Sequence, residues 1–170
     1  MNHQIKNLFE YTNEYNKSLI KPEEFWVKIA ESFQWRKRWE KVLEWDFESP
    51  KIEWFKNAKL NLTENIFEKL IQTHKDKTAI IWEPNDPSSS PIHLSYCELY
   101  KQTCKFANAM KSNGIQKGDR IAGFIPNMPE AIIAMLAAVS IGAVWSSSSP
   151  DFGIKGVLDR FSQIEPRIIF

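Results

Sequence analysis

The sequence contains little cysteine and little glycine, with two Cys and six Gly among 170 residues. Cys97 and Cys104 are seven residues apart. On one helix this spacing corresponds to about 10 Å, which is too far for a disulfide bond. Together with the absence of a CxxC pair, this spacing predicts two reduced thiols, as is usual in the cytosol.

An excess of charge and a long hydrophobic run are also missing. Lys and Arg number 22 and Asp and Glu 21, so the net charge is +1. A nearly neutral chain has no long-range field that attracts nucleic acid or an anionic membrane. The longest apolar run, 131–145, is interrupted by Ser140 and is shorter than the ~20 residues that span a bilayer. We therefore expect a cytoplasmic (cytosolic) protein with no secretory leader, no membrane span and no nucleic-acid partner.

The common motifs of nucleotide, hydrolase and zinc sites do not occur in the sequence. It contains no GxGxxG, no Walker lysine loop, no GxSxG and no HExxH. His3, His74 and His93 are far apart and lack the spacing of metal ligands, so we interpret them as surface or strand-end residues.

Tryptophan is abundant in the first part of the chain, since residues 1–65 hold five of the seven Trp and no Gly. Pro22 predicts the start of a helix. An apolar stripe at helical spacing follows it, formed by Phe25, Trp26, Ile29 and Phe33.

Residues 35–41 alternate cations with aromatic side chains. A platform for single-stranded nucleic acid has this pattern, but neighbouring Glu residues dilute the charge and favour inward packing of the tryptophans. The stretch 48–62 is interpreted as an irregular linking segment, in which Trp54 and Phe55 act as anchors.

From about residue 63 the pattern alternates between helix and strand. Thr63 is a candidate cap for the first helix, and strands are predicted at 78–82 and 92–94. The turn 83–91 between these strands holds three Pro and three Ser. Ser95 and Glu98 then form a capping box at the start of a helix that ends at Gly114.

The pattern continues with a strand at 121–125 and a helix at 131–141, preceded by Asn127 as a candidate cap and Pro129 at the first helical position. This helix is apolar on nearly all sides, so we expect it to be covered on more than one face. A third core strand is predicted at 143–145. The fold class predicted is α/β, a partial parallel sheet with right-handed crossovers and flanking helices, preceded by a helical Trp-rich segment.

A Ser-rich turn, Ser146 to Ser149, is predicted at the carboxyl end of the last strand, where open α/β sheets bind ligands. The helix after it is opened by Pro150, Asp151 and Gly153. A phosphate-binding loop needs Gly for close backbone approach and usually a Lys, so a structural turn is favoured here.

Arg160 lies near the end of that helix, beside Asp159 and Gln163. Two interpretations of Arg160 stay open. It is either a surface residue paired with Asp159 or a cation that binds a phosphate-bearing ligand through its planar fork of donors.

Four segments of the chain resemble the amino-terminal part of the acetoacetyl-CoA synthetases (acetoacetate–CoA ligases), in the adenylate-forming acyl-CoA synthetase superfamily. The Pro-Asp-Phe-Gly run and the long stretch before Arg160 are similar to the acetoacetate enzymes rather than to the acetyl-CoA synthetases. The segments are Trp54 to Asn65, Lys117 to Arg120 with Ile125 to Asn127, Ala134 to Ala143, and Trp145 to Gly153 with Gly156 to Phe161.

The resemblance implies an ATP-dependent ligase that converts acetoacetate and CoA to acetoacetyl-CoA through an acyl-adenylate, with ATP, CoA and Mg²⁺ as cofactors and the small molecule acetoacetate as partner. It implies a Trp-rich segment at 1–65 and the first part of the AMP-binding (adenylation) domain at 66–170. It also implies a role in lipid and ketone-body metabolism. No catalytic or metal-binding residue of the family has a match in this chain, and only Arg160 is carried over, as the arginine near the phosphates of the CoA nucleotide.

Arg167 to Phe170 looks like the middle of a further strand, so we expect a fragment of a larger enzyme that is inactive alone and binds no cofactor tightly. The alternative is a non-catalytic truncated isoform or interaction module with the Trp-rich region as its docking surface. A residual CoA-binding domain that uses Arg160 alone is a third possibility. The sequence predicts no particular protein partner.

Overall fold

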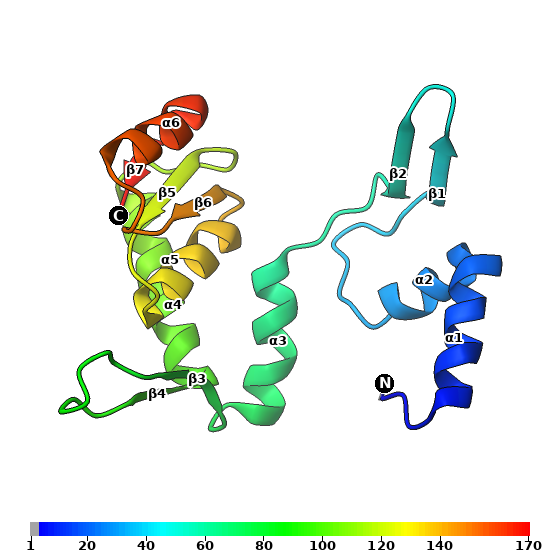
Figure 1. Cartoon of the computed structure of the whole chain (residues 1–170), viewed down its shortest axis with the longest axis horizontal. Helices are drawn as coiled ribbons and strands as arrows, with labels where there is room; N and C mark the ends of the chain where they lie inside the picture. The colour runs from blue at the N-terminus through cyan, green and yellow to red at the C-terminus, as the bar shows by residue number, and fades with distance from the viewer. Residues whose placement is uncertain (1–3) are drawn as a thin grey trace. The chain divides into compact units, whose positions relative to one another are not determined.

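The computed structural model describes residues 4–170, in two compact units that meet in the sequence between Leu60 and Asn61 (Figure 1). Each unit is described by itself. His3, predicted to have no metal role, lies outside the described residues.

The first unit combines two helices with a two-stranded antiparallel sheet. Helix α1, which the sequence analysis did not predict, is capped by the side chain of Asn7. Helix α2 begins at Pro22, as predicted. The elements are α1 (Leu8–Ile20), α2 (Pro22–Ala30), β1 (Lys41–Asp46) and β2 (Lys51–Lys56).

Two predictions for this unit were wrong. The stretch 48–62 is not irregular throughout, because its residues Lys51–Lys56 form β2, which pairs with β1 in a hairpin in which Leu43 lies opposite Trp54. Val42 and Leu43 are adjacent in β1, and Trp54 and Phe55 are adjacent in β2, so neither strand shows the strict polar–apolar alternation that would have indicated it. The apolar stripe of α2 is also shorter than predicted, since the helix ends at Ala30 and Phe33 lies beyond it, half-exposed.

The tryptophans after α2 pack against one another and against β2. The rings of Trp35 and Trp39 are 5.2 Å apart between centroids, and Phe55 lies 5.5 Å and 5.0 Å from them. The indole N–H of Trp35 donates to the carbonyl oxygen of Ala30 at 2.7 Å, which satisfies its polar atom. The packing predicted for these two tryptophans is confirmed.

The second unit is built around a three-stranded parallel sheet with the order β6-β5-β7. A separate antiparallel pair, β3-β4, precedes it. The α/β fold class with a parallel sheet and flanking helices is therefore confirmed. The elements are α3 (Leu62–His74), β3 (Thr78–Trp82), β4 (Ile92–Ser95), α4 (Tyr96–Ser112), β5 (Arg120–Phe124), α5 (Pro129–Ser140), β6 (Val144–Ser148), α6 (Ile154–Ile164) and β7 (Ile168–Ile169).

Helix α5 lies at the centre of this unit and contacts α3, α4, β5 and β6 (Figure 1). Ala137 and Ala138 are completely buried against Ile121 of β5. Their small side chains let the helix approach the sheet and the neighbouring helices at once. Coverage of this helix on more than one face, predicted from its apolar sequence, is confirmed.

Three local predictions are corrected. Asn61 caps α3, while Thr63 lies inside the helix. Met128, not Asn127, is the N-cap residue of α5. Three of the four serines assigned to the turn, Ser146 to Ser148, belong to β6, so the turn begins at Ser149.

Among residues 4–170, no helix combines the length and the apolar character needed to cross a bilayer.

Candidate functional site at the carboxyl edge of the sheet

The carboxyl ends of β5 and β6 lie side by side, with Phe124 opposite Ser148. The loop after β5 and the turn after β6 therefore leave the sheet at the same edge. This is the edge at which open parallel sheets bind ligands, because the connecting loops there form a crevice.

A pocket of about 300 Å³ lies at this edge. Ser148 is 7% exposed, and its hydroxyl has no hydrogen-bond partner among the described residues. A buried hydroxyl without a partner is unfavourable, so a polar ligand atom at this position would stabilise it. The pocket is lined by Ile125, Pro126, Asn127, Ala131, Ile132, Met135, Trp145 and Ser147 to Ser149.

Gly123 allows the ring of Trp145 to lie close to β5. A Cβ atom on Gly123 would be 2.6 Å from Cζ2 of Trp145, which is shorter than any normal contact. The indole that lines the pocket thus rests directly on the backbone of β5. An isolated Gly inside a strand is a signal for such a close approach, although the sequence analysis did not use it.

The loop after β5 is fixed by a residue from a different strand pair. The indole N–H of Trp82, at the end of β3, donates to the carbonyl oxygen of Asn127 at 2.8 Å. This hydrogen bond joins residues 45 positions apart in the sequence and holds the backbone that lines the pocket.

The turn after β6 is closed by its own side chains. The hydroxyl of Ser149 donates to Oδ2 of Asp151 at 2.7 Å and accepts from the backbone N–H of Asp151. Ser149 therefore stabilises the turn itself, as expected for a structural turn rather than a phosphate-binding loop. Helix α6 then starts after Gly153, its N-cap residue, without a side-chain cap.

Arg160 is exposed on α6 and is not paired with Asp159. Its guanidinium carbon lies 3.9 Å from the centre of the Phe152 ring, and its Nη1 donates to the carbonyl oxygen of Gly156 at 3.1 Å. The stacking on Phe152 connects Arg160 to the turn after β6. Arg160 does not, however, line the pocket beside Ser148.

The other end of α6 is anchored to the amino end of β5. Arg120 donates hydrogen bonds to the carbonyl oxygens of Ile164 and Glu165. Arg167 forms an ion pair with Asp119 at 3.0 Å. Because both anchors hold the far end of the helix, the position of Arg160 relative to β5 is fixed by the fold.

No group of three or more His, Cys, Asp or Glu residues suited to a metal ion occurs in the part of the chain that the structure describes. The donor set that Mg²⁺ prefers, several carboxylate and carbonyl oxygens, is not gathered at the sheet edge either. The described residues therefore do not fit a metal centre.

The chain matches two family models in succession. Residues 11–66 match the acetyl-coenzyme A synthetase N-terminus, and residues 67–170 match the AMP-binding enzyme model. The chain belongs to the AMP-binding enzyme family, among its acyl-CoA synthetases.

Relatives named for two different acids are similarly close. The chain is 39% identical over 156 residues to an acetyl-coenzyme A synthetase of Alkalilimnicola ehrlichii, covering 91% of this chain and 24% of the relative. It is 39% identical over 168 residues to an acetoacetyl-CoA synthetase of Danio rerio, covering 96% and 24%.

A solved structure, acetoacetyl-CoA synthetase from Streptomyces lividans, matches with a TM-score of 0.83 and 32% identity. The match covers 91% of this chain and 24% of that structure. The chain thus spans about a quarter of the length of the relatives that it matches.

Proposed function

We propose that the chain forms the leading part of an ATP-dependent ligase that joins acetoacetate to CoA. The observation that carries this proposal is the succession of the two family matches along the chain, together with the structural match to an acetoacetyl-CoA synthetase. Within the proposal, residues 1–65 are the amino-terminal segment and residues 66–170 the first part of the adenylation domain. The cytosol is its proposed location.

The proposed reaction has two steps. The carboxylate of acetoacetate attacks the α-phosphorus of ATP, which forms the acyl-adenylate and releases pyrophosphate. The thiol of CoA then attacks the acyl carbon, which forms acetoacetyl-CoA and releases AMP and a proton. Mg²⁺ would balance the phosphate charge in this scheme, held by groups other than the described residues of this chain.

Residues of this chain are proposed to bind and position rather than to react. The groups for the two chemical steps would come from the rest of a family-length protein, since this chain covers about a quarter of its relatives. We therefore expect no turnover from residues 1–170 alone, and no tight binding of ATP or CoA by them.

Arg160 is proposed to bind a phosphate of the CoA nucleotide. It is exposed, and among the described residues its only hydrogen bond is the one to Gly156. A guanidinium has five N–H donors in a rigid fork, so donors remain for a phosphate oxygen. Stacking on Phe152 limits the freedom of the side chain, which reduces the entropy lost on binding.

Acetoacetate is preferred over acetate in this proposal because the turn Pro150 to Gly153 resembles the acetoacetate enzymes. The test uses the natural polypeptide that contains residues 1–170, assayed with ATP, CoA and either acid. We expect a higher kcat/KM for acetoacetate, and a tenfold preference for acetate would overturn the assignment.

The role of Arg160 is tested in the same polypeptide. Loss of a charged hydrogen bond to phosphate, worth about 1.5–3 kcal/mol, should raise the KM for CoA by about 10- to 150-fold in Arg160→Ala. The matched control is Lys155→Ala, another exposed cation on α6, which should leave this KM unchanged. An unchanged KM for CoA in Arg160→Ala would contradict the role.

A further inference from the structure

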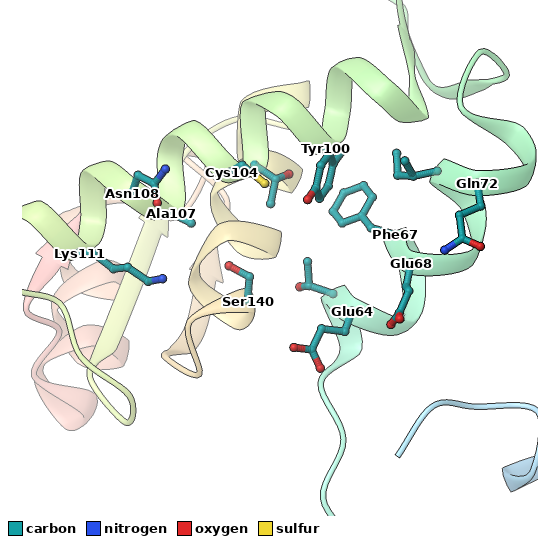
Figure 2. A pocket seen from close by; sticks show the side chains of 13 residues that line it. Glu64, Phe67, Glu68, Gln72, Tyr100, Cys104, Ala107, Asn108, Lys111 and Ser140 are labelled. Carbon is teal, nitrogen blue, oxygen red and sulfur yellow. The ribbon is translucent and has the colours of Figure 1, made fainter. Parts of the chain in front are cut away.

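A second pocket, of about 500 Å³, lies between α3 and α4 in the second unit (Figure 2). It shares no residue with the pocket at the sheet edge. Side chains one helical turn apart on both helices face it, and the end of α5 closes one side. The residues are Thr63, Glu64, Phe67, Glu68, Ile71 and Gln72 from α3, Tyr100, Thr103, Cys104, Ala107, Asn108 and Lys111 from α4, and Ser140 from α5.

One wall of this pocket is apolar. Phe67 and Ala107 are buried, and the ring of Tyr100 meets that of Phe67 edge-on, with 5.2 Å between their centroids. Ile71 extends the same wall along α3. Apolar and aromatic lining of this kind is typical of sites for small organic molecules.

Beside the apolar wall lies a buried polar atom with no partner. Thr103 is 2% exposed, and its hydroxyl makes no hydrogen bond within the described part of the chain. The hydroxyl of a threonine in a helix commonly donates a hydrogen bond to the carbonyl oxygen one turn earlier. The Thr103 hydroxyl lacks this bond. A ligand atom that bonds to it would remove an unfavourable buried group.

Tyr100 and Cys104 are two further polar side chains of α4 that line the pocket. The hydrogen bond with the Cys104 sulfur raises the pKa of Tyr100, and the electrostatic interaction with Cys104 and desolvation of the Tyr100 hydroxyl add to this effect. The Cys104 thiol is half-buried and not in a disulfide, so it can report on access to the pocket.

The charges around the pocket are of both signs. Glu64 and Glu68 project from α3, and Lys111 lies at the far end of α4 (Figure 2). Lys111 offsets one of the two carboxylates, so the rim carries a net charge of only −1. The lining therefore does not favour a strongly charged ligand.

We propose that the pocket between α3 and α4 binds a small uncharged molecule with an aromatic body and a carbonyl or hydroxyl group. The body packs on Phe67, Ile71 and Ala107, and the polar group completes the hydrogen bonding of Thr103.

The test measures alkylation of Cys104 by N-phenylmaleimide and by N-methylmaleimide, with Cys97 as the internal reference. The sulfur adds to the maleimide double bond as its π bond breaks, the thiol proton is lost to water, and the neighbouring carbon takes up a proton from water. Burial of the phenyl ring should raise the Cys104-to-Cys97 rate ratio about 10-fold or more over N-methylmaleimide. Equal ratios for the two reagents, read by peptide mass spectrometry, would overturn the proposal.

Reversible binding is tested with N-phenylsuccinimide, which has the same ring and carbonyl groups but no reactive double bond. It should slow alkylation of Cys104 and leave Cys97 unaffected. Equal slowing of both thiols, or of neither, contradicts the proposal.

Two variants locate the ligand. Asn108→Phe places a ring at the exposed side of the pocket and should abolish protection of Cys104, whereas Gln102→Phe, exposed on α4 outside the pocket, should not. Thr103→Val should weaken protection about 2- to 10-fold without lowering the melting temperature. Full protection in Thr103→Val would show that its hydroxyl does not bind the ligand.

Discussion

The side-chain amide of Asn61 donates a hydrogen bond to the carbonyl oxygen of Val139 at 2.8 Å, which joins the start of α3 to the end of α5. The amide oxygen of Asn61 also accepts from the backbone N–H groups of Thr63 and Glu64 and caps α3. Thr63 adds a second link through its hydroxyl, which donates to the carbonyl oxygen of Leu136 at 3.0 Å. The segment Trp54 to Asn65, one of those that resemble the family, therefore holds α3 against α5 in this chain.

Asn61→Ala should lower the free energy of unfolding by about 2 kcal/mol or more. The substitution removes a helix cap and takes the side-chain donor from the half-buried carbonyl oxygen of Val139. Denaturant unfolding measures the change. The control, Ser95→Ala, removes the exposed cap of α4 and should cost only about 1 kcal/mol. Equal losses in the two variants would show that the bond to Val139 contributes nothing.

Gly123→Ala should destabilise the second unit by about 1–3 kcal/mol, because the new methyl group overlaps the Trp145 ring. The same clash should shift the emission of Trp145. Gly153→Ser is the matched control, since a Cβ atom there meets nothing within 4 Å and serine is a favoured N-cap residue. A Gly123→Ala protein with unchanged stability would contradict the close packing of β5 and Trp145.

Trp82→Phe should loosen the loop after β5. The phenyl ring keeps the apolar packing but cannot donate to Asn127, so about 1 kcal/mol of local stability is lost. Hydrogen exchange at residues 125–128 should become faster. Trp45→Phe, at a more exposed position of β1, should leave this exchange unchanged, and equal protection in both variants would count against the bond to Asn127.

The capping box of α4 predicts a pH dependence. Hydrogen bonds from the hydroxyl and backbone N–H of Ser95 hold the pKa of Glu98 below its usual value of 4.5. Because the pKa is lower in the folded state, Glu98 stabilises the fold above about pH 4.5 and loses this effect as the pH falls through the lowered pKa.

This dependence is measured as the stability difference between the unsubstituted chain and Glu98→Ala from pH 7 to pH 3. The difference should be constant near neutral pH and should shrink below pH 4.5. Glu83→Ala, at an exposed loop position, controls for general charge effects. A difference that stays constant down to pH 3 would contradict the ionised capping box.

Local patterns predicted most elements of the second unit. The capping box at Ser95, the stop at Gly114 and Pro129 at the start of α5 all act within a few residues, so the sequence shows them directly. The hairpin of the first unit was missed. Strand pairing depends on partners elsewhere in the chain, and adjacent apolar residues in β1 and β2 break the alternation that is typical of a strand.

The candidate site was predictable only in its location. The strand-to-helix turn after β6 marked the carboxyl edge. Arg160 was a candidate from its residue type, and the resemblance implied its role near the phosphates of the CoA nucleotide. The bond from Trp82 to Asn127, the isolated hydroxyl of Ser148 and the stacking of Arg160 on Phe152 were not predicted. These contacts depend on side-chain orientation, and the first also joins distant parts of the chain.

The most direct test of the central claim is AMP release by a chimera in which residues 1–170 replace the matching quarter of the Danio rerio acetoacetyl-CoA synthetase. Because the two segments are 39% identical, we expect the replacement to fold in place. The proposal predicts AMP release that depends on ATP, CoA and acetoacetate, with none from residues 1–170 alone. A chimera that is folded and monodisperse but releases no AMP would contradict the assignment of this chain as the leading part of a working ligase.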